Sequence, residues 1–368
     1  MCLYLTNGER TMLVILMIVC AWDRVVGQFE NGIVFSSGPT TRAPAPASTT
    51  NPPALLIPDS KCSCILGSAC PNQGPTIDIR IVNNGVNTKC PTNYMLCCGG
   101  TPNQPTPTDP ACGVRRFVQP NPQPVVGQAS FGSYPWQAAV LDLQEAYKGS
   151  GVLLDATHVL TAAHKVSSYV NNPASLLVRV GDWNARETTE PFKFVQALVA
   201  KITVHPNFNP TTLENDVAVI RINGVIPIAS YPNVNTACKP TSTPATGTRC
   251  YVSGWGKNAF TSGSYQSIMR EVDVPILDIY DCENRLRQTR LGPTFTLNKM
   301  SFLCAGGEVG KDACTGDGGS PLVCQGNNNQ WSVYGLVAWG IGCANPGIPG
   351  VYTNVFNFLP WINNALTQ

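Results

Sequence analysis

From about Val125 onward, short apolar runs alternate with glycine, proline and asparagine. The clearest runs are WQAAVL (136–141), LLVRV (176–180), VAVIRI (217–222), CYVSGW (250–255) and VYGLVAW (333–339). Many short runs of this kind, separated by turn residues, are typical of strands and predict an all-β sandwich or barrel. The last stretch, FNFLPWINNAL (356–366), predicts a short C-terminal helix.

The N-terminus has a different pattern. An unbroken apolar run, Met12 to Trp22, follows Arg10 and precedes Asp23 and the small residues ending at Gly27. The run is too short to span a bilayer, so it predicts a signal peptide over residues 1–27 rather than a membrane anchor. A buried N-terminal helix is the alternative. No later segment is long enough for an anchor, and we expect a secreted, extracellular protein.

Two proline-rich stretches flank a cysteine-rich one. Residues 28–60 form a first predicted linker, because a Pro/Ser/Thr-rich composition cannot bury enough apolar surface to offset its ordering entropy. Residues 61–98 hold six cysteines in a module too small for much core, which therefore depends on disulfides. Residues 99–124 form a second linker that carries the lone Cys112, and residues 125–368 form the β-rich domain.

Composition narrows the class of function. The 368 residues are 43% hydrophobic and 12% charged with a net charge of +2, so no basic tract is available for nucleic acid. Two of the sixteen cysteines, Cys2 and Cys20, lie in the predicted signal peptide, and the remaining even number predicts a disulfide framework. Metal binding is the competing interpretation, but none of the three histidines stands at ligand spacing from a cysteine pair.

Four segments carry candidate chemistry, in this order: LTAAH (160–164), Asn215-Asp216, CTGDGGSPLVC (314–324) and AWGIGC (338–343). In this order and setting, residues 125–368 resemble the chymotrypsin/trypsin family. The resemblance implies two packed six-stranded β-barrels with the site between them. It places a catalytic His, Asp and Ser at His164, Asp216 and position 318.

Position 318 is a glycine. Cys314 at one end and Pro321 at the other fix the register of the motif, so Gly318 occupies the place of the nucleophilic serine. Glycine has no oxygen to attack a carbonyl. Ser320 lies up to about 7 Å along an extended chain, whereas a base must lie within about 3.2 Å of the nucleophile. We expect no peptidase activity, and Ala338, where the family usually has serine, agrees.

Other family features persist or are lost. Asp312, Gly340 and Gly350 match the pocket that prefers basic side chains, which is either a working groove or an unused remnant. The backbone amides of Gly316 and Gly318 match the oxyanion hole. Lys165 replaces a family cysteine, and the partner expected near Gly149 is also missing.

Activation departs from the family as well. Active relatives are cut after a basic residue, and the new amine pairs with the aspartate before the serine, here Asp317. In this chain Pro124 precedes Val125, so a trypsin-like enzyme will not cut there. We expect Asp317 to lack its usual ammonium partner.

The six-cysteine module resembles a clip domain, because it starts with Cys-x-Cys, ends with Cys97-Cys98 and is joined by a Pro-rich linker to Cys112. The sequence alone allows fifteen pairings of its cysteines. The two resemblances together imply the disulfides Cys62–Cys97, Cys64–Cys90, Cys70–Cys98, Cys112–Cys238, Cys250–Cys324, Cys282–Cys304 and Cys314–Cys343.

Two weaker patterns remain. In related proteases the loop matching residues 181–191 often binds Ca²⁺, and here Asp182 and Glu190 are candidate ligands, with Glu187 a further one. A solvated acidic loop explains the same residues equally well, and no cofactor is required. Arg80 precedes a β-branched pair and a turn, which predicts a cleavage site at Arg80–Ile81. The rival sites are Arg42, Arg115 and Arg116 in sequence expected to be flexible.

A clip domain followed by a protease domain that lacks its serine resembles the clip-domain serine protease homologues of insects. The resemblance implies a secreted, non-catalytic cofactor or scaffold in a haemolymph cascade, with an activating clip-domain protease and prophenoloxidase as partners, and with oligomers after cleavage. Extracellular adhesion or microbial recognition on the same scaffold is the alternative. An active trypsin-like enzyme is a third class, which Gly318 opposes.

Overall fold

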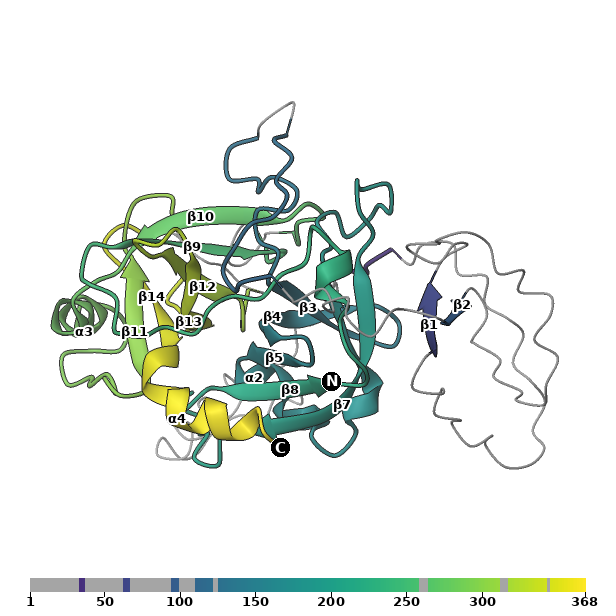
Figure 1. Cartoon of the computed structure of the whole chain (residues 1–368). Coiled ribbons are helices and arrows are strands. Elements are labelled where there is room, and N and C mark those ends of the chain that lie inside the picture. The colour runs from purple at the N-terminus through teal and green to yellow at the C-terminus, as the bar shows by residue number, and fades with distance from the viewer. Residues whose placement is uncertain are drawn as a thin grey trace, which may run out of the picture. The chain divides into compact units, whose positions relative to one another are not determined.

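The computed structural model describes residues 33–36, 62–66, 94–98, 110–121, 125–257, 264–311, 317–342 and 345–368. The chain divides into two compact units, residues 40–108 and the remainder (Figure 1). In the smaller unit, β1 (Cys62–Leu66) pairs antiparallel with β2 (Tyr94–Cys98), and Cys62 lies opposite Cys98 in the backbone register. The predicted clip disulfides and Arg80 fall outside the described residues or side chains.

The first half of the larger unit is a closed six-stranded barrel with the strand order β3-β4-β5-β8-β7-β6. Its strands are β3 (Gln137–Asp142), β4 (Tyr147–Asp155), β5 (His158–Thr161), β6 (Leu176–Val180), β7 (Val195–Val204) and β8 (Ala218–Ile222). Successive side chains of a strand point to opposite faces. On β3, Ala138 and Val140 therefore join the barrel core, while Ala139 and Leu141 join the cluster shared with the second half.

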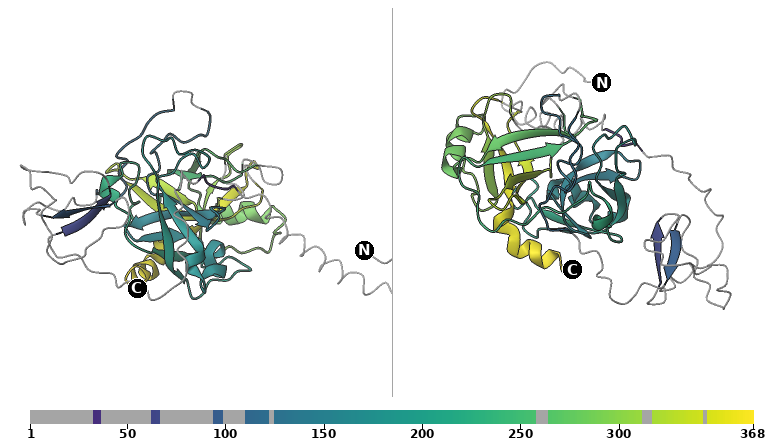
Figure 2. Two further views of the ribbon diagram at one scale, coloured as in Figure 1. Left: turned by 90° about the vertical axis from the view of Figure 1, so that its right-hand side faces the viewer. Right: turned by 45° about the horizontal axis from the view of Figure 1, so that its top comes forward.

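The second half is a six-stranded sheet with the order β10-β9-β12-β13-β14-β11. Its strands are β9 (Arg249–Gly254), β10 (Arg270–Pro275), β11 (Phe302–Gly306), β12 (Pro321–Gln325), β13 (Trp331–Trp339) and β14 (Pro349–Asn354). An antiparallel bridge between Ile276 and Ala305 joins the two ends of this sheet. The two six-stranded halves lie side by side (Figure 2), which confirms the double barrel expected from the family.

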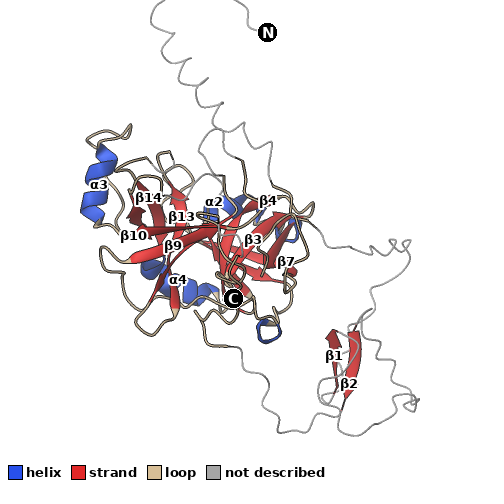
Figure 3. Ribbon diagram, turned by 90° about the horizontal axis from the view of Figure 1, so that it is seen from above, coloured by secondary structure: helices blue, strands red, loops and turns tan. Residues whose placement is uncertain are grey.

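The helices in the described part of the larger unit are α2 (Ala163–Val166), α3 (Ile279–Arg287) and α4 (Val355–Ala365), with 3₁₀ turns η2 (Ser167–Tyr169), η3 (Pro173–Ser175) and η4 (Ile228–Ser230). Among them, α3 lies at the periphery and α2 near the centre (Figure 3). Asp278 caps α3 by accepting hydrogen bonds from the amides of Tyr280 and Asp281. α4 is the predicted closing helix and follows directly on β14. No helix in the described part of the chain is long and apolar enough to cross a membrane.

The structure contains the disulfides Cys112–Cys238, Cys250–Cys324 and Cys282–Cys304. Cys314 and Cys343 lie outside the described residues.

Residues 110–121, inside the predicted second linker, are packed on the barrels. Arg116 donates hydrogen bonds to the carbonyls of Ile228, Ala229, Tyr231 and Val234. The guanidinium of Arg115 stacks on the ring of Trp331 at 4.2 Å. Both arginines therefore lie in ordered chain, contrary to the expectation of flexible cleavage sites, because their side chains are held by the barrel surface.

Candidate degenerate active site

His164 and Asp216 come together at the seam between the barrels. His164 belongs to the short helix α2 that follows β5, and Asp216 lies just before β8. The histidine Nδ1 is 2.6 Å from Asp216 Oδ2, and its backbone amide donates to Oδ1 at 2.8 Å. Asp216 is fully buried, and its carbonyl accepts a hydrogen bond from Thr353. The pair has the geometry of a base and its orienting carboxylate.

Gly318 faces this pair. A Cβ built on Gly318 would stand 2.7 Å from His164 Nε2 and would overlap Cε of Lys165. The position of the missing nucleophile is therefore adjacent to the base, and the end of a lysine side chain takes up the space where a serine would begin. The backbone carbonyl of Gly318 accepts a hydrogen bond from the amide of Ser150 at 3.1 Å.

Lys165 lies next to both Gly149, where a family disulfide is missing, and Gly318, where the serine is missing. Its stem also passes over Gly149, where a Cβ would lie 2.9 Å from Lys165 Cγ. The lysine thus runs through the space vacated by the missing disulfide and reaches the space vacated by the serine. Burial lowers the pKa of its amine, and the carboxylates of Asp317 and Asp216 oppose that shift. Sequence reasoning noted the paired loss of cysteines but missed where the lysine goes.

Ser320 does not replace the nucleophile. It is fully buried, its amide is held by the carbonyl of Asp317 at 2.7 Å, and its carbonyl accepts from Val337. Within the described residues its Oγ has no hydrogen-bond partner, and a Cβ on Gly254, on the second barrel, would touch it. The hydroxyl therefore faces Gly254 and has no base to activate it.

Asp317 is held by a hydrogen bond, whereas the activation segment around Val126 lies at the surface. Asp317 Oδ1 accepts a hydrogen bond from the amide of Gly256 at 3.0 Å. Val126 is 93% exposed, and its carbonyl accepts from Arg270 Nη2 at 2.8 Å. The segment that supplies the amine in active relatives is thus a turn at the surface of this chain.

The structure describes some of the remaining family positions, and others lie outside the described residues. Gly350 is buried in β14 opposite Ala305 of β11, and Gly340 is an exposed residue that follows the end of β13. Ala338 is buried in β13. Asp312 and Gly316 lie outside the described residues. The specificity pocket and the oxyanion hole therefore stay predictions.

Two of the candidate calcium ligands, Asp182 and Glu190, lie together in the loop between β6 and β7. Burial, together with the neighbouring Asp182 carboxylate, raises the pKa of Glu190 to about 7, although two backbone amides oppose the shift. Asp182 is 3.2 Å from the guanidinium of the fully buried Arg179. No cluster of three acidic, histidine or cysteine ligands occurs in the described part of the chain. These carboxylates already have partners, so calcium stays a prediction that this geometry does not favour.

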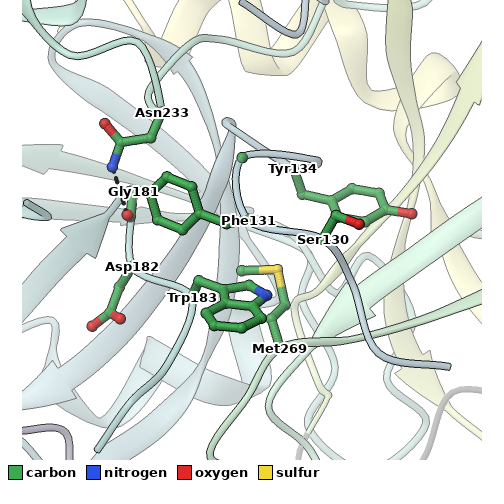
Figure 4. Close-up of a pocket in the computed structure, with 9 residues that line it drawn as sticks. Ser130, Phe131, Tyr134, Gly181, Asp182, Trp183, Asn233 and Met269 are labelled. Atoms are coloured by element: carbon green, nitrogen blue, oxygen red, sulfur yellow. Dashed lines mark hydrogen bonds between the residues drawn. The ribbon is translucent and has the colours of Figure 1, made fainter. Parts of the chain in front are cut away.

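A small pocket adjoins this loop (Figure 4). Asp182 and Gly181 line it on one side, and the amide of Asn233 donates to the Gly181 carbonyl at 2.7 Å. None of the degenerate triad positions lines this pocket, so it is separate from the former active site.

The comparisons with known proteins agree with this geometry. The family model named Trypsin matches residues 125–362. The chain belongs to the trypsin family. It is 44% identical over 87% of its length to the inactive CLIP domain-containing serine protease A3 of Aedes aegypti, of which the match covers 68%.

Two further relatives are similar to this chain over most of their own length. Phenoloxidase-activating factor 2 of Galleria mellonella is 40% identical, covering 65% of this chain and 82% of that protein. The inactive CLIP domain-containing serine protease A28 of Anopheles gambiae is 33% identical, covering 76% and 78%. The chain is thus a clip-domain serine protease homologue with a catalytically inactive trypsin fold.

Proposed function

We propose that the protein is a secreted, non-catalytic cofactor of a haemolymph protease cascade that activates prophenoloxidase. The observation that carries this proposal is a complete double barrel with an intact His164–Asp216 pair around a position that has no nucleophile. A fold retained without its chemistry acts through its surfaces, by binding other proteins. The likeness to a phenoloxidase-activating factor supports this choice of cascade.

The proposed partners are an activating clip-domain protease, prophenoloxidase, or both. The chain would hold the zymogen and its protease in a productive complex, which raises the rate of activation by proximity rather than by cutting. Cleavage at Arg80 by a cascade protease is the proposed trigger, and assembly into oligomers is the proposed response.

Reconstitution tests the proposal. Prophenoloxidase and an activating clip-domain protease are mixed with or without the recombinant full-length chain, and phenoloxidase activity is followed by quinone absorbance. We expect the chain to raise activity in a saturable, concentration-dependent manner, with an unrelated disulfide-rich protein as control. Equal activity in both arms would contradict the proposal, and binding to microbial surfaces without that effect would favour the recognition alternative.

A further inference from the structure

Residues 33–36 lie within the predicted first linker, yet they are packed on the barrels. Exposure alternates along them: Ile33 is 6% exposed, Val34 57% and Phe35 1%. Alternation of this kind is the pattern of a strand with one buried face. The Pro/Ser/Thr-rich stretch that suggested a linker begins only at Ser36. Residues 33–36 are too few for an alternation of apolar and polar positions to be recognised from the sequence.

Backbone hydrogen bonds attach this segment to the turn between β3 and β4. The Phe35 amide donates to the Glu145 carbonyl at 2.9 Å, and the Ile33 carbonyl accepts from Tyr147 at 2.9 Å. Val34 forms an antiparallel bridge with Ala146. The segment therefore pairs with the turn between β3 and β4 through backbone hydrogen bonds, the kind of contact by which extended peptides are recognised.

The Phe35 side chain anchors the strand. Its ring meets Trp255 edge-on at 5.2 Å and stacks on Tyr147 at 5.9 Å. The guanidinium of Arg179 lies 5.3 Å from the ring centre, and one of its nitrogens donates to the Ser36 carbonyl at 3.2 Å. Arg179 is itself fully buried and paired with Glu145 at 3.0 Å. The side chains that contact Phe35 thus include one, Arg179, that is held in place by its own ion pair.

We propose that Tyr147, Trp255 and Arg179 form a strand-docking site whose occupant is residues 33–36 of this chain. Residues 40–108 leave the larger unit after this strand and rejoin it before Cys112. The clip-bearing unit is therefore fastened at both ends, reversibly by Phe35 and covalently by Cys112–Cys238. A cut in the second linker still leaves it held by the docked strand, so release of the clip unit is a reversible dissociation and not an automatic result of cleavage.

The experiment cuts that linker in the full chain. A recognition sequence for a site-specific protease is inserted between residues 101 and 108, and the N-terminal fragment carries a fluorophore. After cutting and dilution, anisotropy measures the dissociation constant of the labelled fragment from the barrels. Phe35→Ala should weaken binding about 100-fold or more, as truncation of a buried phenylalanine does. The neighbouring Val34→Ala, at an exposed position, should stay within about threefold of wild type.

Two further measurements test whether Phe35 anchors the docked strand. In the uncut chain, Phe35→Ala should speed hydrogen exchange at the Tyr147 amide, which bonds to Ile33, and Val34→Ala should not. If Phe35→Ala does not fold, a peptide of residues 28–38 should displace the wild-type fragment, whereas the same peptide with alanine at position 35 should not. Equal affinities for both single variants, or no saturable binding of the wild-type fragment, would overturn the proposal. No step uses prophenoloxidase, so the outcome is independent of the cofactor role.

Discussion

Restoring the lost serine should not restore the enzyme. In Gly318→Ser the new Cβ would overlap Lys165 Cε and stand 2.7 Å from His164 Nε2, closer than ordinary contacts between such atoms. Lys165 must move, and its stem is also confined over Gly149. Overpacking of this kind typically costs about 1–3 kcal/mol. The hydroxyl would then compete with the lysine for the place beside the base.

The double variant Gly318→Ser/Lys165→Ala removes the obstacle. Because the two positions touch, their effects on unfolding free energy should be coupled by about 0.5–3 kcal/mol, with the lysine truncation relieving the cost of the serine. Thermal or denaturant unfolding of the wild type, both single variants and the double variant measures this coupling without any reference to catalysis.

Fluorophosphonate labelling, located by mass spectrometry, follows the chemistry. We expect no labelling of wild type, Lys165→Ala or Gly318→Ser, and slow labelling at position 318 in the double variant. The residual defect should be at least about 10²–10³-fold relative to an active enzyme, the usual cost of an imperfect oxyanion hole, since Pro124 opposes trypsin-like cutting before Val125. If Gly318→Ser alone is labelled as fast as the double variant, Lys165 is not the obstacle. Labelling of the wild type at Ser320 would refute the assignment of the site itself.

Three other predictions concern stability and control. Because the folded pKa of Glu190 is raised from 4.5 to about 7, its contribution to stability should be full below pH 4.5 and lost as the pH rises through 7, so Glu190→Gln should flatten the pH dependence of the melting temperature by the equivalent of about 1 kcal/mol. Arg80→Gln should prevent both the appearance of a new N-terminus at Ile81 and any cofactor activity that depends on it. Cys112→Ser/Cys238→Ser should cost about 2–4 kcal/mol in denaturant unfolding, and an unchanged midpoint would contradict the role of this tether.

Strands were predictable where the local pattern of apolar residues fits a strand and not a helix. The run at 176–180 coincides with β6, because five residues rich in leucine and valine between turn residues have no helical alternative of that length. The order in which the strands pair was not predictable from these runs, since pairing depends on contacts between distant residues. The resemblance to the trypsin family supplied it, and the closed first barrel confirms that fold.

Some features of the candidate site were likewise predictable from the sequence, and others were not. The loss of the nucleophile followed from Cys314 and Pro321, which hold the motif in register. The path of Lys165 did not, because a long side chain goes where space is left, and that space is set by Gly149 and Gly318 far away along the chain. Arg116 was misjudged as a flexible site for a similar reason. Its four carbonyl partners all lie more than a hundred residues along the chain.

Turnover is blocked here by three features, two of which, Gly318 and Lys165, lie next to one another. Gly318 removes the attacking oxygen, Lys165 fills the space beside the base, and Pro124 precedes Val125, where a trypsin-like enzyme will not cut. Reversing one of the three leaves the other two in place, and no single substitution should produce a protease. What these changes leave undisturbed is the barrel framework and its buried His164–Asp216 pair. The activity of this chain should therefore be measured as binding, by titrating partners against it, and its substitutions judged by affinity and assembly rather than by rate.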